Sequence, residues 1–375
     1  MTTTALPRSA ARPSLRQRLR RVADAAVTPL ELDDVLDVFA PLRAGAPGLR
    51  GKVVAVRPET TESATIVVRP GRDWAGHVPG QYVRVGVEVD GVRLWRTYSL
   101  THGPRPDGCI AITVKAIPGG VVSNHLVRRA KPGDVLQLDQ AQGDFVLASP
   151  LPSKVLMVTA GSGITPVIGM LRNLFSRSEP VRADIVLVHS ALTRDGVIFG
   201  RELRRYAEQG LITLHERHTD ADGMLDVAEL GGLVPDLAER TTYACGPVGL
   251  LDALEAHHTA ADLPLHVERF RPVVVPVDAG DGGTATFVST AGETTVEADG
   301  ATPLLDAGES AGVLLPSGCR MGVCFGCVVP LREGAVRDLR NGELTVATPG
   351  ETGPDGIPIQ TCVSAAAGTC RIDSL

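Results

Sequence analysis

Aromatic residues are scarce in this 375-residue chain, at 3% of the sequence. Its hydrophobic cores must therefore be built mainly from Val, Leu, Ile and Ala. No stretch approaches the ~20 uninterrupted apolar residues that a membrane-spanning helix needs. Residues 1–14 also lack the apolar run of a secretory signal. We therefore expect a cytoplasmic protein.

Lysine is absent from residue 275 onward, where thirteen acidic residues face five arginines, a balance of −8 in a chain of net charge −6. Phosphate contacts need Lys and Arg, so this acidity argues against nucleic acid as a partner. It suits docking onto a basic protein surface. Ordinary solvated acidity is the alternative interpretation.

The seven cysteines are an odd number and do not indicate a secreted disulfide framework. Four of them follow the pattern C-x4-C-x2-C, with the fourth after 34 intervening residues. This is the plant-type ferredoxin spacing for a [2Fe-2S] cluster. Zinc usually takes two paired short knuckles and is the weaker alternative. Cys370 is expected to be a packed thiol, and the predicted ligands are Cys319, Cys324, Cys327 and Cys362.

Changes of pattern along the chain indicate three domains. Short alternating runs separated by Gly, Pro and Asp turns predict an antiparallel β-barrel. Buried runs that alternate with helices predict an α/β domain with a parallel sheet. The ferredoxin spacing implies an α+β domain of the β-grasp type. We expect an N-terminal tail and helical extension (1–45), the barrel (46–150), the α/β domain (151–272), a linker (273–283) and the ferredoxin domain (284–375).

The N-terminal extension is expected to contain a helix from Ser14 to the break at Thr28-Pro29. Arginines at 16, 18, 20 and 21 give it a basic character. One interpretation is peripheral contact with anionic lipid at the inner face of the membrane. The alternative, which we favour, is a solvated basic helix packed on its own domain.

An R-x-Y-S motif, Arg96-Thr97-Tyr98-Ser99, ends a predicted barrel strand. Its arginine can neutralise a phosphate, its tyrosine can lie against an isoalloxazine ring, and its serine hydroxyl can reach flavin N5. The sequence LWRTYSL resembles the flavin-binding signature of the ferredoxin–NADP reductase superfamily, and the resemblance covers residues 51–272. It implies FAD, in preference to FMN, bound by these four residues, with Ser99 in a catalytic role.

A second element, KAIPGGVVS, ends a strand and starts the helix SNHLVRRA at Ser123, where backbone N–H groups bind anions well. In the superfamily that it resembles, this stretch holds the flavin pyrophosphate. A strand-end aromatic and a simple turn are the plain alternatives for the two elements. The remaining predicted flavin-site residues are Thr113, Lys115, Gly119, Gly120, Val121, Val122 and Ser123.

The motif G-x-G-x-x-P at residues 161–166 follows a predicted strand and opens a helix, with Pro166 expected at the first helical position. It differs from the G-x-G-x-x-G of two-half dinucleotide-binding domains. It resembles the form that the superfamily uses for the nicotinamide dinucleotide, which implies contacts from Gly161, Gly163, Thr165 and Pro166.

Two further elements complete the expected nicotinamide site. Cys245-Gly246-Pro247 resembles the turn that the superfamily places beside the nicotinamide ring, and a thiol there would help to orient C4 toward flavin N5. Glu268 and Phe270 match the reductase terminus, where an acid and an aromatic residue line the flavin. We therefore predict Cys245 and Glu268 as catalytic residues; a plain strand before a linker is the alternative for 268–270.

The choice of coenzyme depends on the turn after the strand ADIVLVHSA. NADPH needs cations for its 2′-phosphate, whereas NADH tolerates an acid near the ribose. Ser190 and Arg194, with Arg201 or Arg204 behind them, favour NADPH over NADH. Asp195 favours NADH, because it is an acid close to these residues.

The resemblance as a whole implies an electron-transfer enzyme that passes electrons from NADPH through FAD and the cluster to a partner protein. The order of domains resembles phthalate-dioxygenase-type reductases and reductases of membrane fatty-acid desaturases and hydroxylases. The N-terminal extension resembles actinobacterial reductases that partner acyl-CoA desaturases, so a membrane desaturase or hydroxylase is the expected partner. The alternatives are a soluble ring-hydroxylating oxygenase or cytochrome P450 as partner, and a redox-sensing electron-carrier module.

Overall fold

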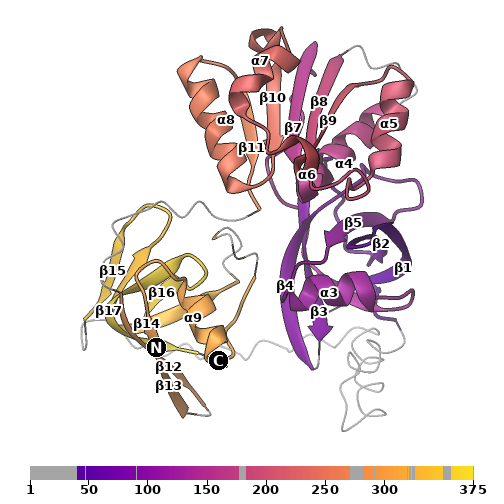
Figure 1. Cartoon of the computed structure of the whole chain (residues 1–375). Helices are drawn as coiled ribbons and strands as arrows, with labels where there is room; N and C mark the ends of the chain where they lie inside the picture. Colours follow the sequence, from indigo (N-terminus) through magenta and orange to yellow (C-terminus); the bar gives the residue numbers. More distant parts are fainter. Residues whose placement is uncertain are drawn as a thin grey trace, which may run out of the picture.

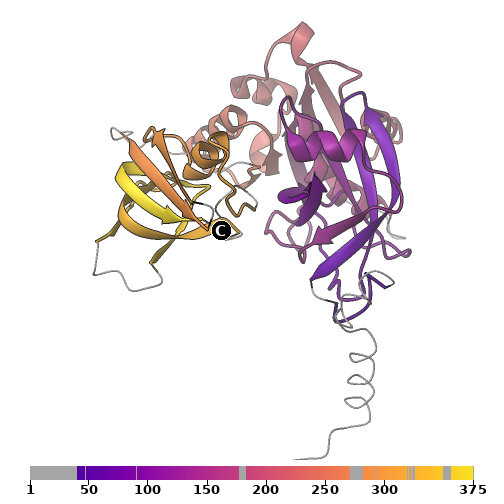
Figure 2. The same cartoon turned by 90° about the horizontal axis from the view of Figure 1, so that it is seen from below.

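The computed structural model describes residues 40–46, 48–89, 91–176, 183–270, 282–290, 292–318, 320, 322, 326–348 and 356–374. The predicted N-terminal helix and nearly all of the predicted linker lie outside this part of the chain. The α/β domain adjoins the barrel, and the ferredoxin domain lies beside β4 of the barrel (Figures 1 and 2). No helix of the described residues is both long and apolar enough to cross a membrane.

The first domain is a six-stranded antiparallel barrel with strand order β4-β3-β6-β1-β2-β5. A bridge from Leu100 to Ile112 joins the two ends of this sheet and closes it. Alternating Val, Ile and Leu side chains fill the interior, as the sequence pattern predicts. The elements are β1 (Leu49–Thr60), β2 (Ser63–Pro70), β3 (Tyr82–Val89), β4 (Val92–Ser99), β5 (Ile110–Lys115), α3 (Val121–Arg128) and β6 (Val135–Leu138).

The second domain has a five-stranded parallel sheet in the order β11-β10-β7-β8-β9. Helices α4 and α5 contribute to the core on one face, and α7 and α8 to the core on the other. The elements are β7 (Lys154–Ala160), α4 (Ile164–Phe175), β8 (Asp184–Ala191), α5 (Gly200–Glu208), β9 (Thr213–His218), α6 (Thr219–Asp222), α7 (Leu230–Leu233), β10 (Thr241–Cys245), α8 (Val248–Ala260) and β11 (Leu265–Glu268).

The start of α4 corrects one prediction. A 3-10 turn over Gly161–Gly163 leads directly into α4 at Ile164, so Pro166 is the third helical residue rather than the first. Proline fits there because N–H groups of the first turn have no partner within the helix.

The third domain is a mixed sheet in the order β13-β12-β17-β14-β15, with β16 paired to β14. Strands β12 and β17 run parallel and the other pairs are antiparallel. Leu304 of α9 packs into the core of this sheet, which gives the predicted α+β arrangement. The elements are β12 (Gly283–Ser289), β13 (Gly292–Ala298), α9 (Leu304–Ser310), β14 (Val328–Asp338), β15 (Leu344–Ala347), β16 (Ile357–Gln360) and β17 (Ser364–Asp373).

Helix α4 also joins the α/β domain to the barrel. A Cβ added at Gly169 would lie 2.4 Å from the carbonyl oxygen of Leu100, so only glycine permits this approach. One turn later, Arg172 Nη1 donates to the carbonyl of Thr101 at 2.8 Å. Its Nε and Nη2 bind both carboxylate oxygens of Glu202 in α5 at 3.0 and 2.6 Å. This contact fixes the end of β4 against α4.

We predict that Arg172→Met lowers the free energy of unfolding by about 3 kcal/mol, because it leaves the largely buried carboxylate of Glu202 without its cation and with only the Tyr206 hydroxyl as a partner. Arg172 and Glu202 are 13% and 20% exposed. The control is Arg371→Met, which breaks an exposed ion pair with Glu293 and should cost about 1 kcal/mol or less. Urea unfolding followed by circular dichroism provides the measurement. Equal costs for the two variants would contradict the prediction.

Candidate flavin, nicotinamide and cluster sites

A cavity of about 290 Å³, here called the barrel cavity, opens where the ends of β4 and β5 face the α/β domain. It brings together residues that are distant in sequence, including the R-x-Y-S motif, the glycine turn and the end of β11. The predicted residues that line it are Arg96, Thr97, Tyr98, Ser99, Thr113, Lys115, Thr165, Glu268 and Phe270.

The polar groups of the barrel cavity fit a flavin. The buried Thr97 hydroxyl has no hydrogen-bond partner among the described residues, which is expected for a group that hydrogen-bonds to a ligand. Burial raises the pKa of Tyr98 far above its usual value, so the ring enters the site as a neutral phenol. Arg96 is cationic and suits a phosphate, although burial and then the charge of Arg320 lower its pKa.

Glu268 and Cys245 lie next to each other at the ends of β11 and β10. Burial, and after it the charge of Asp144, raises the pKa of Glu268 to about 7. Burial and then the charge of Glu268 raise the pKa of Cys245, so this fully buried residue stays a neutral thiol. A carboxyl with a pKa near neutrality can hold or release a proton beside Ser99.

We predict that Glu268 makes stability fall with pH. The native protein retains a proton that the unfolded chain releases above about pH 4.5, so its stability declines as the pH rises through about 7. The melting temperature of the wild type should therefore drop, relative to Glu268→Gln, between about pH 5 and about pH 8.

Thermal unfolding of the flavin-free protein at several pH values makes this measurement. Glu208→Gln, on an exposed position of α5, is the control and should follow the wild type. A constant difference between wild type and Glu268→Gln across this range would contradict the assignment.

A second cavity of about 510 Å³, the glycine-turn cavity, adjoins the first. Gly161, Gly163, Gly246 and Pro247 line it, and it shares Lys115, Ser162 and Phe270 with the barrel cavity. A Cβ at Gly163 would lie 2.0 Å from the carbonyl oxygen of Cys245. The glycine turn and the C-G-P turn are therefore pressed together, and Pro166 is buried behind them.

A third cavity, the β8 cavity, continues from the glycine-turn cavity through Ala160, Gly161 and Pro247, and has a volume of about 590 Å³. Ser190 lines it, and the buried Ser190 hydroxyl has no partner among the described residues. Together the second and third cavities suit the two halves of a dinucleotide.

The three arginines predicted near the 2′-phosphate differ in their ion pairing and in their position. Arg204 lies in an ion pair with Glu216, at 2.9 Å, so its charge is already balanced by a carboxylate of β9. Arg194 and Arg201 are exposed, and Arg194 does not line the β8 cavity as the described residues form it. Arg194 lies in the loop after β8, close enough for Arg204 to donate to its carbonyl at 3.2 Å.

The pyrophosphate-binding stretch contains both site residues and packing residues. Helix α3 begins at Val121, not at Ser123 as predicted, with Gly120 as its N-cap. Val122 is buried in the barrel core, so its side chain has a packing role. The Ser123 hydroxyl donates to the carbonyl of Gly120, and Gly119 has φ +71°, which glycine adopts readily.

The cluster loop is described in part, since Cys319 and Cys324 lie outside the described residues. Cys327 and Cys362 are buried, and their Sγ atoms lie 3.1 Å apart. Arg340 and Gln360 donate to the carbonyl of Gly322 at 3.0 and 2.9 Å, which fixes part of the loop. Two thiols converging under such a loop fit thiolate ligation of iron.

The cluster loop lies against the barrel. A Cβ at Gly326 would lie 2.7 Å from Arg84 Nη2, next to the predicted ligand Cys327. Arg84 pairs with Asp139 at 2.9 Å and lies over the ring of Trp95. The ferredoxin domain thus approaches the barrel at the edge where its predicted iron ligands lie.

Sequence reasoning missed four residues of the barrel cavity: Tyr82, Ile117, Ser162 and Arg320. Ser162 lies inside the glycine motif and Ile117 inside KAIPGGVVS, so both were available as motif positions. Tyr82 and Arg320 come from other segments, and no local pattern marks them. Arg320 in particular reaches this cavity from the cluster loop of another domain.

The three domains and their cavities define a nicotinamide-dependent flavoprotein oxidoreductase with an iron–sulfur domain. Comparison with known families agrees. The family described as "Oxidoreductase FAD-binding domain" matches residues 65–147, and "Oxidoreductase NAD-binding domain" matches residues 157–256. The "2Fe-2S iron-sulfur cluster binding domain" family matches residues 287–367.

Similar proteins match most of this chain. An "NADPH oxidoreductase" of Mycobacterium tuberculosis is 46% identical over 95% of this chain and 92% of its own length. The "glycine betaine monooxygenase reductase subunit" of Pseudomonas aeruginosa is 32% identical over 71% of this chain and 80% of its own. The structure of phthalate dioxygenase reductase superposes with a TM-score of 0.57 at 22% identity, over 86% of this chain and 97% of its own.

This chain belongs to the family of NAD(P)H-dependent oxidoreductases that combine FAD-binding, NAD-binding and [2Fe-2S] domains in one polypeptide. The predicted three-domain fold and the predicted cofactors, FAD, NAD(P)H and a [2Fe-2S] cluster, are confirmed at this level.

Proposed function

We propose that this reductase passes electrons from NADPH to a partner oxygenase, with a membrane fatty-acyl desaturase or hydroxylase as the favoured partner. The observation that carries the electron path is the continuity of the cavities. The glycine-turn and barrel cavities share Lys115, Ser162 and Phe270. Arg320 then connects the barrel cavity to the cluster loop.

The bound flavin supplies the chemistry that converts a two-electron donor into single electrons for the cluster. The residues of the chain would bind the flavin and the nicotinamide and orient them. Ser99 and Glu268 present a hydroxyl and a carboxyl in the barrel cavity, while Phe270 lies between this cavity and the next. Cys245, the first residue of the C-G-P turn, has a neutral thiol and so places no charge there.

The partner proposal is supported by the extension and by the relatives. Reductases of glycine betaine and 3-ketosteroid monooxygenases match 71–78% of the chain. The Mycobacterium tuberculosis relative matches 95%, so its similarity reaches into residues 1–45, the segment that resembles reductases of acyl-CoA desaturases. A soluble ring-hydroxylating oxygenase or cytochrome P450 is the alternative partner, and a redox-sensing carrier is a further alternative.

Reconstitution tests the choice of partner. We expect NADPH-dependent desaturation of an acyl-CoA when the purified protein is added to membranes that contain a desaturase. A soluble ring-hydroxylating oxygenase should support much slower NADPH oxidation. Success with the soluble oxygenase and failure with membranes would overturn the desaturase proposal, and negligible reduction of cytochrome c would favour the redox sensor.

The two redox sites should be separable by mutation. We predict that Cys362→Ser abolishes the visible absorbance and electron paramagnetic resonance signal of the cluster, because it removes a predicted ligand. Reduction of ferricyanide by NADPH should continue through the flavin. Cys370→Ser is the control, since this buried thiol lies in β17 outside the ligand pattern, and it should retain the cluster. If Cys362→Ser lost ferricyanide reduction together with the cluster signal, the two redox sites would not be separable.

We also propose NADPH as the preferred coenzyme, supported by the name of the Mycobacterium tuberculosis relative and by Arg194 in the loop after β8. Arg194→Met should raise KM for NADPH by about tenfold, the loss expected for one charged contact. NADH lacks the 2′-phosphate and is the internal control, so its KM should stay unchanged. A parallel rise for both coenzymes would assign Arg194 a structural role.

A further inference from the structure

A groove of about 530 Å³ lies between the barrel and the ferredoxin domain, and we call it the interdomain groove. One wall consists of β4 and the start of α3, and the other is the loop at 312–317 after α9. In Figure 1, α9 lies on the side of the ferredoxin domain that faces β4. Its volume lies in the range of small-molecule sites.

The interdomain groove is continuous with the barrel cavity. Arg96 and Arg320 line both of them, one from each domain. The barrel cavity, at about 290 Å³, is the smaller of the two. A ligand whose ring system occupies the barrel cavity, and which is longer than that cavity, can extend past these two arginines into the groove.

Arginine side chains gather in the groove. Four arginines and one acidic residue line it, and Arg84, Arg96 and Arg320 contribute from both walls. Ion pairs hold two of these side chains in place: Arg84 with Asp139, and Arg320 with Asp306 at 2.9 Å and with Glu309. Nη1 and Nη2 of Arg320 already donate to these two carboxylates, while its buried Nε has no partner among the described residues. That Nε and the guanidinium of Arg96 are the groups that suit phosphate oxygens here.

Beyond the arginines the groove is apolar. Leu314, in the loop after α9, is 71% exposed, and Val121, the first residue of α3, is 52% exposed. Leu94, Trp95 and Leu315 complete this surface. Exposed apolar side chains gathered in one groove indicate a binding site. A flat aromatic base packs well on such a surface.

We propose that the interdomain groove binds the adenylate half of FAD, with Arg96 and Arg320 at the diphosphate and Leu314 and Trp95 at the adenine. The ferredoxin domain thereby forms part of the flavin site. This inference deepens the proposed electron-transfer function and rests on it for the identity of the flavin. FMN ends at its single phosphate and does not reach the apolar part of the groove.

Flavin affinity of the full-length apoprotein tests this proposal without any turnover. FAD and FMN are titrated separately, and binding is followed by the change in flavin fluorescence. In the wild type FAD should bind at least tenfold more tightly than FMN. Leu314→Asp should weaken FAD binding by about tenfold and leave FMN binding within about twofold. Arg320→Met should weaken FAD binding more than FMN binding.

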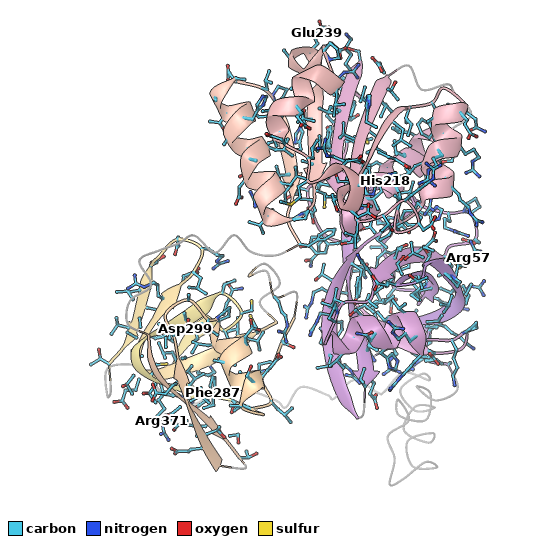
Figure 3. All side chains as sticks on the ribbon, viewed as in Figure 1. Arg57, His218, Glu239, Phe287, Asp299 and Arg371 are labelled. Carbon is cyan, nitrogen blue, oxygen red and sulfur yellow. The ribbon has the colours of Figure 1, made fainter. Side chains whose placement is uncertain are left out.

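Two variants in the same domain serve as matched controls. Leu344→Asp changes a comparably exposed leucine of β15. Arg371→Met removes an ion-paired arginine that lies on the side of the ferredoxin domain away from the barrel (Figure 3). Both should retain the wild-type ratio of FAD to FMN affinity.

The outcomes separate the two levels of inference. An apoprotein that binds neither flavin contradicts the proposed electron-transfer function itself. If FAD binds but Leu314→Asp and Arg320→Met keep the wild-type FAD-to-FMN ratio, the function stands and the role of the interdomain groove is overturned. A loss of FAD affinity in the controls equal to that in the test variants also overturns it.

Discussion

The approach of α4 to the end of β4 is the contact on which the active geometry depends. Gly169 lies against the Leu100 carbonyl, one residue beyond Ser99 of the flavin motif. The N-terminal end of the same helix continues the glycine turn that lines the next cavity. One rigid helix therefore connects two motifs from different domains, and Arg172 holds it in place through Thr101 and Glu202. Without this packing, the barrel and glycine-turn cavities would not share residues.

Much of this arrangement could be predicted from sequence, because its signals are local. Alternating apolar residues identify the barrel strands, buried runs identify the parallel sheet, and cysteine spacing identifies the iron–sulfur domain. The motifs also name most residues of the barrel cavity. Helix starts were less accurate: α3 begins two residues before the predicted Ser123, and α4 begins two residues before Pro166.

The features that sequence reasoning could not provide depend on partners far away in the chain. Arg204 looked like a phosphate-binding cation, but Glu216 on β9 pairs with it. Val122 stands inside a binding motif, yet its side chain fills the barrel core. Arg320 belongs to the cysteine loop, yet it lines a cavity of the barrel. The acidity of the ferredoxin domain is likewise partly balanced within the domain, as in the pairs of Asp373 with Arg332 and of Glu293 with Arg371.

The boundary between the barrel and the ferredoxin domain is sensitive to the size of the side chain at position 326, which is a glycine. Any side chain at this position would meet the guanidinium of Arg84, since even a Cβ lies only 2.7 Å from Nη2. The close fit of the cluster loop against the barrel thus depends on the absence of a side chain at position 326. Because electron tunnelling slows steeply with distance, an alanine here would act as a spacer, and its effect would appear as a slower internal transfer rather than as a weaker cofactor.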